Sequence, residues 1–375
     1  MGCQNTSTVN SSNNSSSIYT PINVGPYTLK NKVIMAAMTR CRAGESGVPN
    51  DIMIKYYSER AADAGLILTE ATAISAVGNG FPGSACAYNE EHKKGWKRLI
   101  EAVHKNNGKI FVQLCHVGRA VNKDMIGGVN PIAPSRILNR YGDSKKYTEP
   151  DEIDLTGIKQ VISEFKHSAQ LLKEAGADGV QIHAANGYLV DQFLRDATNT
   201  RTDNYGGSIV NRARFLFEVI DEVSKVFKSN RIAIKLSPVG RFNDMFDSNP
   251  KELMKYLCKE LDKKNLAFVE VCQAPDLMVE NLYHIKGEDQ IPDIFNELKK
   301  SLKNTVLVGN NGINPEEAIS LIKNGKIDMV SFGKMYMSNP DLLKRIKEKA
   351  EIAPPKFEYA YTGGSEGYSD FPLLD

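Results

Sequence analysis

From residue 33 onward, short apolar runs alternate with longer amphipathic runs, and this alternation limits the possible folds more than any other feature of the sequence. Parallel strands joined by crossover helices produce such a pattern. The apolar runs predict strands at Val33–Ala37, Leu66–Ala73, Ile110–Leu114, Gly179–His183, Arg231–Leu236, Ala267–Cys272, Thr305–Val308 and Met329–Phe332.

The amphipathic runs predict helices, several of which begin with a capping residue or a proline. They are expected near Asp51–Ala64, Trp96–Asn106, Thr156–Ala175, Ile209–Phe227, Pro250–Lys263, Ile291–Leu302, Pro315–Lys323 and Pro340–Glu348. Eight strand–helix units predict an α/β protein, a single (β/α)8 TIM barrel at residues 18–375. The alternative is a doubly wound open sheet, whose dinucleotide-binding members carry Gly-x-Gly-x-x-Gly after the first strand. No such motif follows Val33–Ala37.

One connection is unusually long. It runs from His116 to about Leu155, after the third expected strand, and is rich in Gly, Pro and Asn. Loops of that length in a compact domain usually serve function. We expect this excursion to cover the mouth of the barrel.

Residues 1–17 are expected to form a disordered tail, because residues 4 to 17 are almost wholly Asn, Ser, Thr and Gln. The tail begins Met1-Gly2-Cys3, which fits the N-myristoylation pattern and places a palmitoylation candidate beside it. A tract this rich in Ser and Thr also matches such a pattern by chance. Two hypotheses stay open: a cytoplasmic protein, or one held at a membrane through acyl chains on Gly2 and Cys3.

Composition excludes several classes of function. With 41% hydrophobic residues, 25% charged residues and a net charge of +2, the chain is an ordinary globular protein with no expected nucleic-acid partner. Its six cysteines contain no Cys-x-x-Cys pair, so we expect neither a metal site nor a disulfide framework. A reducing, cytoplasmic compartment fits best.

Two glycine-containing loops follow the last two expected strands. They read Gly309-Asn310-Asn311-Gly312 and Gly333-Lys334. In TIM barrels these positions commonly bind phosphate, through backbone N–H groups and a nearby cation. Turn glycines alone give the same pattern, so the pair of loops, rather than either loop, favours a phosphorylated ligand.

Three side chains able to donate hydrogen bonds lie together at the end of the fourth expected strand. His183 and Asn186 can polarise a carbonyl oxygen, and Tyr188 can deliver a proton. Each residue taken alone is more often a packed core residue. The residues themselves therefore indicate a barrel enzyme that binds a phosphorylated ligand and activates a carbonyl, without identifying the cofactor.

Longer motifs carry a family resemblance. The segments His183–Leu189, Asp191–Leu194, Arg201–Ser208 and Asn211–Arg214 resemble signatures of the old yellow enzyme family, the FMN-dependent ene-reductases that include 12-oxophytodienoate reductases. The likeness extends from about Tyr19 to the end of the chain. It includes Met38-Thr39-Arg40-Cys41, Thr69-Glu70-Ala71 and Leu236-Ser237-Pro238.

The resemblance implies non-covalent FMN at the barrel mouth. The residues implied to bind it are Ala36, Ala37, Met38, Thr39, Ala71, Gln113, Lys235, Gly309, Asn310, Gly312, Gly333 and Lys334. Lys235 and Lys334 stand where the family has arginines, beside flavin N1 and O2 and at the FMN phosphate, so a positive charge remains but the planar fork is lost. Cys115 stands where the family usually has tryptophan.

The resemblance also implies a reaction. NADPH or NADH passes a hydride to flavin N5, and the flavin passes it to the β-carbon of an α,β-unsaturated carbonyl compound, such as a cyclic enone or oxylipin, or to a quinone or nitroalkene. His183 and Asn186 are implied to hold the substrate oxygen, Tyr188 to protonate the α-carbon, and Tyr361 to pack against the substrate. One shared pocket predicts ping-pong kinetics.

Two other functions are consistent with the sequence. A sugar-phosphate aldolase or isomerase could use the same phosphate loops with Lys235 as a Schiff base, and its purified protein would be colourless. A membrane-anchored, FMN-binding redox sensor would bind flavin without rapid oxidation of NADPH.

Overall fold

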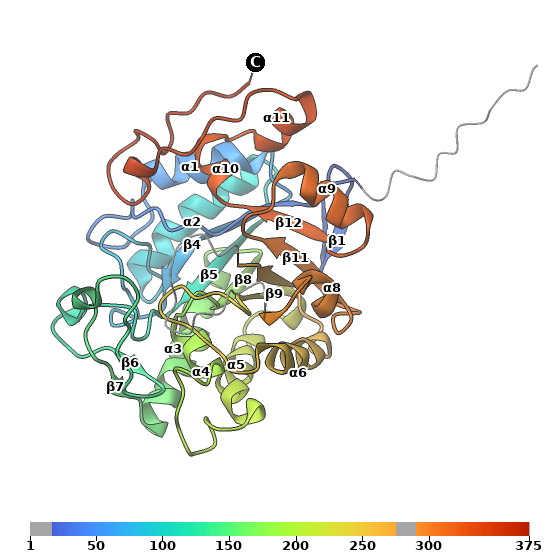
Figure 1. Cartoon of the computed structure of the whole chain (residues 1–375). Coiled ribbons are helices and arrows are strands. Elements are labelled where there is room, and N and C mark those ends of the chain that lie inside the picture. The colour runs from blue at the N-terminus through green and yellow to red at the C-terminus, as the bar shows by residue number, and fades with distance from the viewer. Residues whose placement is uncertain (1–16, 275–289, 375) are drawn as a thin grey trace, which may run out of the picture.

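The computed structural model describes residues 17–274 and 290–374. Its barrel strands are β3 (Val33–Met35), β4 (Leu66–Ala73), β5 (Ile110–Cys115), β8 (Gly179–Ala184), β9 (Ile232–Leu236), β10 (Phe268–Cys272), β11 (Val306–Asn310) and β12 (Met329–Phe332). Within the described residues, these eight parallel strands close in the order β10-β11-β12-β3-β4-β5-β8-β9, with helices around them (Figure 1). The predicted (β/α)8 TIM barrel is confirmed.

The longer helices around the barrel begin at a residue whose side chain caps them. The surrounding helices are α1 (Asp51–Ala61), α2 (Glu90–Lys105), α3 (Leu155–Glu174), α4 (Leu189–Leu194), α5 (Ile209–Ser224), α6 (Pro250–Asp262), α8 (Ile294–Lys299), α9 (Pro315–Lys323), α10 (Lys334–Ser338) and α11 (Leu342–Glu348). The side chain of Asp154 accepts a hydrogen bond from the Gly157 backbone N–H to cap α3, and Asn314 caps α9 in the same way.

Some predicted helix boundaries are wrong. Helix α2 begins at Glu90 instead of Trp96, because the Asn89 side chain accepts a hydrogen bond from the His92 N–H. Helix α8 is six residues long, whereas Ile291–Leu302 was expected to be helical. The backbone of Asp293, just before α8, has a φ of 49°, outside the helical region.

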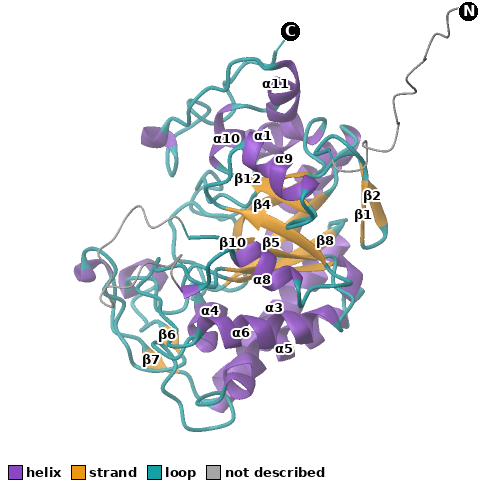
Figure 2. Cartoon of the chain, turned by 45° about the vertical axis from the view of Figure 1, so that its right-hand side comes forward, coloured by secondary structure: helices purple, strands orange, loops and turns teal. Residues whose placement is uncertain are grey.

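A short hairpin covers the amino-terminal end of the barrel. It consists of β1 (Ile22–Val24) and β2 (Tyr27–Leu29), which are not among the strands expected from the sequence. Val24 and Leu29 pack against the apolar side chains that fill this end, including Phe111. Figure 2 shows the hairpin and the excursion at opposite sides of the barrel. The amino-terminal end is therefore filled with apolar side chains, and polar chemistry is left to the carboxyl end.

The excursion between β5 and α3 has local structure of its own. It contains η1 (Lys123–Ile126), β6 (Ile132–Ala133), η2 (Ser144–Lys146) and β7 (Asp151–Glu152), and β6 pairs with β7. The Arg201 guanidinium fastens it by donating to the backbone oxygens of Pro134 and Ile153. Its first turns, with Val117 and Ala120, pack in one apolar cluster with Tyr188, as expected of a segment that covers the mouth.

Two arginines attach the C-terminal segment, which follows α11, to the loop after β3. Arg40 donates to the backbone oxygens of Ala360 and Gly367, both at 2.9 Å. Arg42 donates to the Tyr359 oxygen at 2.7 Å. Tyr361 lies in this segment, with 62% of its surface exposed. We call residues 357–369 the C-terminal strap.

Membrane attachment gains no support from the described residues. Among them, no helix combines the length and the apolar character needed to cross a bilayer. Gly2, Cys3 and nearly all of the expected tail lie outside the described residues.

Candidate active site

Six polar side chains from adjacent strands meet inside the barrel. Gln113, Gln181, Lys235, Glu270, Asn310 and Ser331 come from β5, β8, β9, β10, β11 and β12, and all are buried. We call them the buried polar network. Polar groups buried this deeply need hydrogen-bond partners, and here each member bonds to another.

The hydrogen bonds of this network converge on Glu270. Gln181 Nε2 donates to Glu270 Oε2 at 2.7 Å, and Ser331 Oγ donates to Oε1 at 2.6 Å. Lys235 Nζ lies 3.3 Å from the same Oε1 and also 3.3 Å from Asn310 Oδ1. Gln113 joins through a 2.7 Å hydrogen bond to Gln181. Gln113, Lys235 and Asn310, implied by the resemblance to bind flavin, therefore share one connected structure.

The environment of Lys235 determines its charge. Burial lowers the pKa of Lys235, but the neighbouring Cys272 and Glu270 raise it, and the net pKa lies above the usual value. A Schiff-base lysine needs a neutral amine, usually obtained through a lowered pKa. Lys235 is instead a buried cation, which argues against the aldolase hypothesis.

His183 lies beside Lys235 on the adjacent strand. The two residues are paired in the register of β8 and β9. Burial, and then the Lys235 charge, lowers the pKa of His183 to about 3, so its imidazole is neutral at physiological pH. Its Nδ1 is buried and has no hydrogen-bond partner among the described residues. A neutral imidazole keeps one ring N–H, which can donate a hydrogen bond to a polar ligand atom.

Tyr188 lies against His183. The ring centroids are 4.9 Å apart in a T-shaped arrangement. Burial raises the pKa of Tyr188 above its usual value, and Cys115 packs in the same apolar cluster as Tyr188. Tyr188 therefore stays protonated. Burial also raises the pKa of the Cys115 thiol, so Cys115 stays a protonated, poorly nucleophilic thiol.

Asn186 is held in place by residues that are not among the site residues expected from the sequence. Its backbone has a left-handed φ of 58°. Its N–H donates to Ser237 Oγ at 2.7 Å, and its backbone oxygen accepts from Asn243 Nδ2 at 2.8 Å. Asp191 accepts from the Gly187 N–H and pairs with Arg195 at 3.0 Å. The sequence could have indicated two of these residues, because Asp191 and Ser237 lie in the motifs that resemble the old yellow enzyme family.

Small side chains line the mouth where β3 and β12 end. Ala36 is buried, whereas Ala37, Met38, Thr39 and Ala71 are half-buried. Gly333 lies against this row: a Cβ there would come within 2.8 Å of Met38 Sδ. Alanine and glycine leave space at this end of β3 and β12, where the resemblance implies that the planar ring of FMN binds.

The two expected phosphate loops differ in their exposure. Asn311 and Gly312 are exposed, with left-handed φ values of 71° and 74°. Lys334 is exposed, with Nζ 5.7 Å from the centroid of the Phe357 ring. Gly309 is buried, and a Cβ there would come within 3.0 Å of the Ile313 side chain. The exposed members are therefore the ones available to a phosphate.

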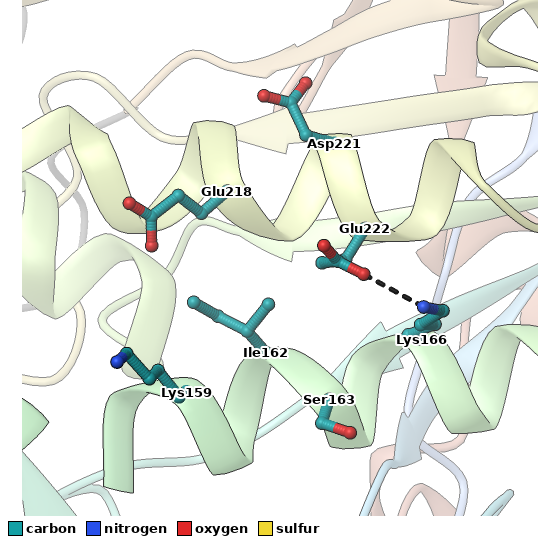
Figure 3. A pocket seen from close by; sticks show the side chains of 7 residues that line it. All are labelled: Lys159, Ile162, Ser163, Lys166, Glu218, Asp221 and Glu222. Atoms are coloured by element: carbon teal, nitrogen blue, oxygen red, sulfur yellow. Dashed lines mark hydrogen bonds and ion pairs between the residues drawn. The ribbon is translucent and has the colours of Figure 1, made fainter. Parts of the chain in front are cut away.

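A separate pocket lies on the outer surface, between α3 and α5 (Figure 3). Its volume is about 320 Å³, and its lining includes Lys159, Ile162 and Glu218. Lys166 and Glu222 pair across it at 3.0 Å. Since it is lined by residues of the outer helices, it is no part of the site at the strand ends.

The chain matches known proteins over almost its entire length. The model of the NADH:flavin oxidoreductase / NADH oxidase family matches residues 17–352. The flavin oxidoreductase hxnT of Emericella nidulans is 35% identical, with 95% of this chain and 97% of the relative covered. The 12-oxophytodienoate reductase 1 of Oryza sativa subsp. japonica is also 35% identical, with 96% and 93% covered.

A solved structure gives the same result. The old yellow enzyme homologue from Zymomonas mobilis is 37% identical, with a TM-score of 0.89 and 96% of this chain and 100% of that chain covered. The chain belongs to the NADH:flavin oxidoreductase / NADH oxidase family, the old yellow enzyme family, and is an oxidoreductase that uses FMN and NAD(P)H.

Proposed function

We propose that the enzyme is an ene-reductase, which reduces the carbon–carbon double bond of α,β-unsaturated carbonyl compounds. The observation that carries the proposal is the contact between a neutral His183, which pairs with Lys235 across β8 and β9, and a protonated Tyr188 just before α4. Relatives named for the reduction of 12-oxophytodienoate, an unsaturated ketone, support it. Cyclic enones, oxylipins, quinones and nitroalkenes are the substrate classes to test.

His183 and Asn186 bind the substrate oxygen in this proposal. Both can donate a hydrogen bond, and a donor aimed at that oxygen stabilises the negative charge that develops on it. The neutral state of His183 supports this role, because a neutral imidazole keeps one N–H that can donate to the substrate oxygen. Tyr361, exposed on the C-terminal strap, packs against the rest of the substrate.

When bound, FMN would supply the hydride-transfer chemistry that links NAD(P)H to the β-carbon of the substrate. Lys235 provides positive charge at the flavin edge, and the small residues around Gly333 hold the ring. Asn311, Gly312 and Lys334 bind the phosphate. Tyr188 delivers the proton to the α-carbon and is reprotonated from water, so one hydride and one proton are added across the double bond.

The test compares the two half-reactions of Tyr188→Phe. Reduction of the FMN-loaded variant by NADPH should stay within about threefold of wild type, and its reoxidation by 2-cyclohexenone should slow by about 100-fold or more, as expected for loss of a general acid. Tyr256→Phe, on the outer helix α6, is the control and should leave both rates unchanged. Equal losses in both half-reactions would contradict the role of Tyr188.

A further inference from the structure

Glu270 is an unusual residue for its position. It lies in the middle of β10, in the apolar sequence Phe-Val-Glu-Val-Cys, and its side chain is completely buried. Burying a carboxylate is costly unless donors and a positive charge compensate it. Glu270 has donors from three strands: Gln181 on β8, Lys235 on β9 and Ser331 on β12. The barrel interior is therefore built around this carboxylate.

The pairing with Lys235 has an electrostatic consequence. The register of β9 with its two neighbours places Lys235 between His183 on one side and Glu270 on the other. The charges of Lys235 and Glu270 have opposite sign, and their side chains are 3.3 Å apart. Seen from the carboxyl end of the barrel, the carboxylate offsets much of the positive potential of the ammonium group.

That potential matters for the bound cofactor. Reduced flavin is stabilised, relative to oxidised flavin, by positive charge near N1 and O2, because negative charge accumulates there on reduction. A lysine with no acidic partner would therefore raise the midpoint potential of FMN. A lysine paired with a buried carboxylate raises it less.

We propose that Glu270 tunes the cofactor: by pairing with Lys235, it keeps the midpoint potential of bound FMN lower than Lys235 alone would set it. The inference rests on the proposed position of the flavin beside Lys235. It makes Glu270 a positioning and charge-balancing residue that does not itself touch the reacting atoms. A lower potential favours delivery of hydride to the second substrate over its capture from NAD(P)H.

The experiment measures the two-electron midpoint potential of FMN-reconstituted protein by anaerobic titration against reference dyes at pH 7. Glu270→Gln keeps the size and an acceptor oxygen but removes the charge. It should stabilise reduced over oxidised FMN by at least tenfold, which raises the potential by about 30 mV. The dissociation constant of oxidised FMN should change less than threefold. Glu222→Gln, on the outer helix α5, is the control and should leave the potential unchanged.

A second variant separates this inference from the proposed function. Lys235→Met should lower the potential, because it leaves Glu270 near the flavin without the cation. If Lys235→Met lowers the potential and Glu270→Gln leaves it unchanged or lowers it, only the role of Glu270 is wrong. If neither variant moves the potential, the flavin does not lie beside Lys235, and the inference and the proposed cofactor geometry are both wrong. The Tyr188→Phe half-reactions test catalysis independently of either result.

Discussion

The side-chain amide of Asn243 donates a 2.8 Å hydrogen bond to the backbone oxygen of Asn186, joining the loops that follow β9 and β8. Both residues have a left-handed backbone, with φ values of 59° and 58°. Asn243 also hydrogen-bonds to Tyr188. One asparagine therefore contacts two of the three residues assigned to substrate activation.

Replacing that asparagine should loosen the site without dismantling the barrel. Asn243→Ala removes the bond to Asn186, and a hydrogen bond contributes about 1 kcal/mol, so kcat/KM for 2-cyclohexenone should fall about fivefold or more. Steady-state kinetics measures the effect. Asn204→Ala, at an exposed loop position, is the control. A variant that matches wild type would show that Asn186 keeps its position without Asn243.

Buried histidines should make the fold sensitive to acid. Burial lowers the pKa of His116 to about 4, below the ordinary 6.5 of an unfolded histidine. The unfolded chain then binds more protons between these values, so stability is fully present above pH 6.5 and is lost as the pH falls toward 4. When the pH is lowered from 7 to 5, the unfolding free energy should fall in both proteins, and the fall should be about 2 kcal/mol smaller in His116→Gln than in the wild type. Urea unfolding at both pH values measures it. Equal losses would show that the folded His116 titrates normally.

Burial of Glu70 should give the unfolding free energy the opposite pH dependence. Burial raises its pKa to about 7, although the Arg40 N–H hydrogen bond lowers it in part. The folded chain then binds more protons than the unfolded chain between about 4.5 and 7, so this stability is present at low pH and is lost as the pH rises through 7. When the pH is raised from 5 to 8, the unfolding free energy of Glu70→Gln should fall by about 2 kcal/mol less than that of the wild type. Urea unfolding at both pH values tests this, with exposed Glu101→Gln as control.

The C-terminal strap depends on the guanidinium of Arg40. Lysine lacks the fork that reaches Ala360 and Gly367 together, so Arg40→Lys should destabilise the protein by about 2 kcal/mol and release the strap. Chymotrypsin should then cleave faster after Tyr361, and KM for the enone should rise severalfold. Arg98→Lys, on the exposed face of α2, provides the comparison. Unchanged cleavage would mean that the strap is held by other contacts.

The barrel itself could be predicted from the sequence, because each strand is a buried run bounded by turn residues. The expected strand Met329–Phe332 matches β12 residue for residue. The short hairpin at Ile22–Leu29 was not predicted, because its strands mix polar and apolar residues and form no continuous apolar run like that of Val33–Met35. Helix α8 is shorter than expected, because the left-handed backbone of Asp293 delays its start to Ile294, and intrinsic propensity does not predict that conformation.

The site was only partly visible in the sequence. The order of strands and loops placed His183 and Tyr188 at one strand end, and the structure brings them into contact. The bond between Asn186 and Asn243 joins residues 57 positions apart and has no local signature. Glu270 did leave a signal, a charged residue inside an apolar strand, but its partner Lys235 is evident only once the strands are paired in register.

Strand β12 pairs with β3, and Gly333 lies against Met38, so the proposed flavin surface joins the first barrel strand to the last. During synthesis, the residues around Met38 leave the ribosome about 300 residues before Gly333 does. A nascent chain therefore carries half of this surface for most of its translation. A ligand that needs both halves of this surface can therefore bind only after the last barrel strand has been synthesised.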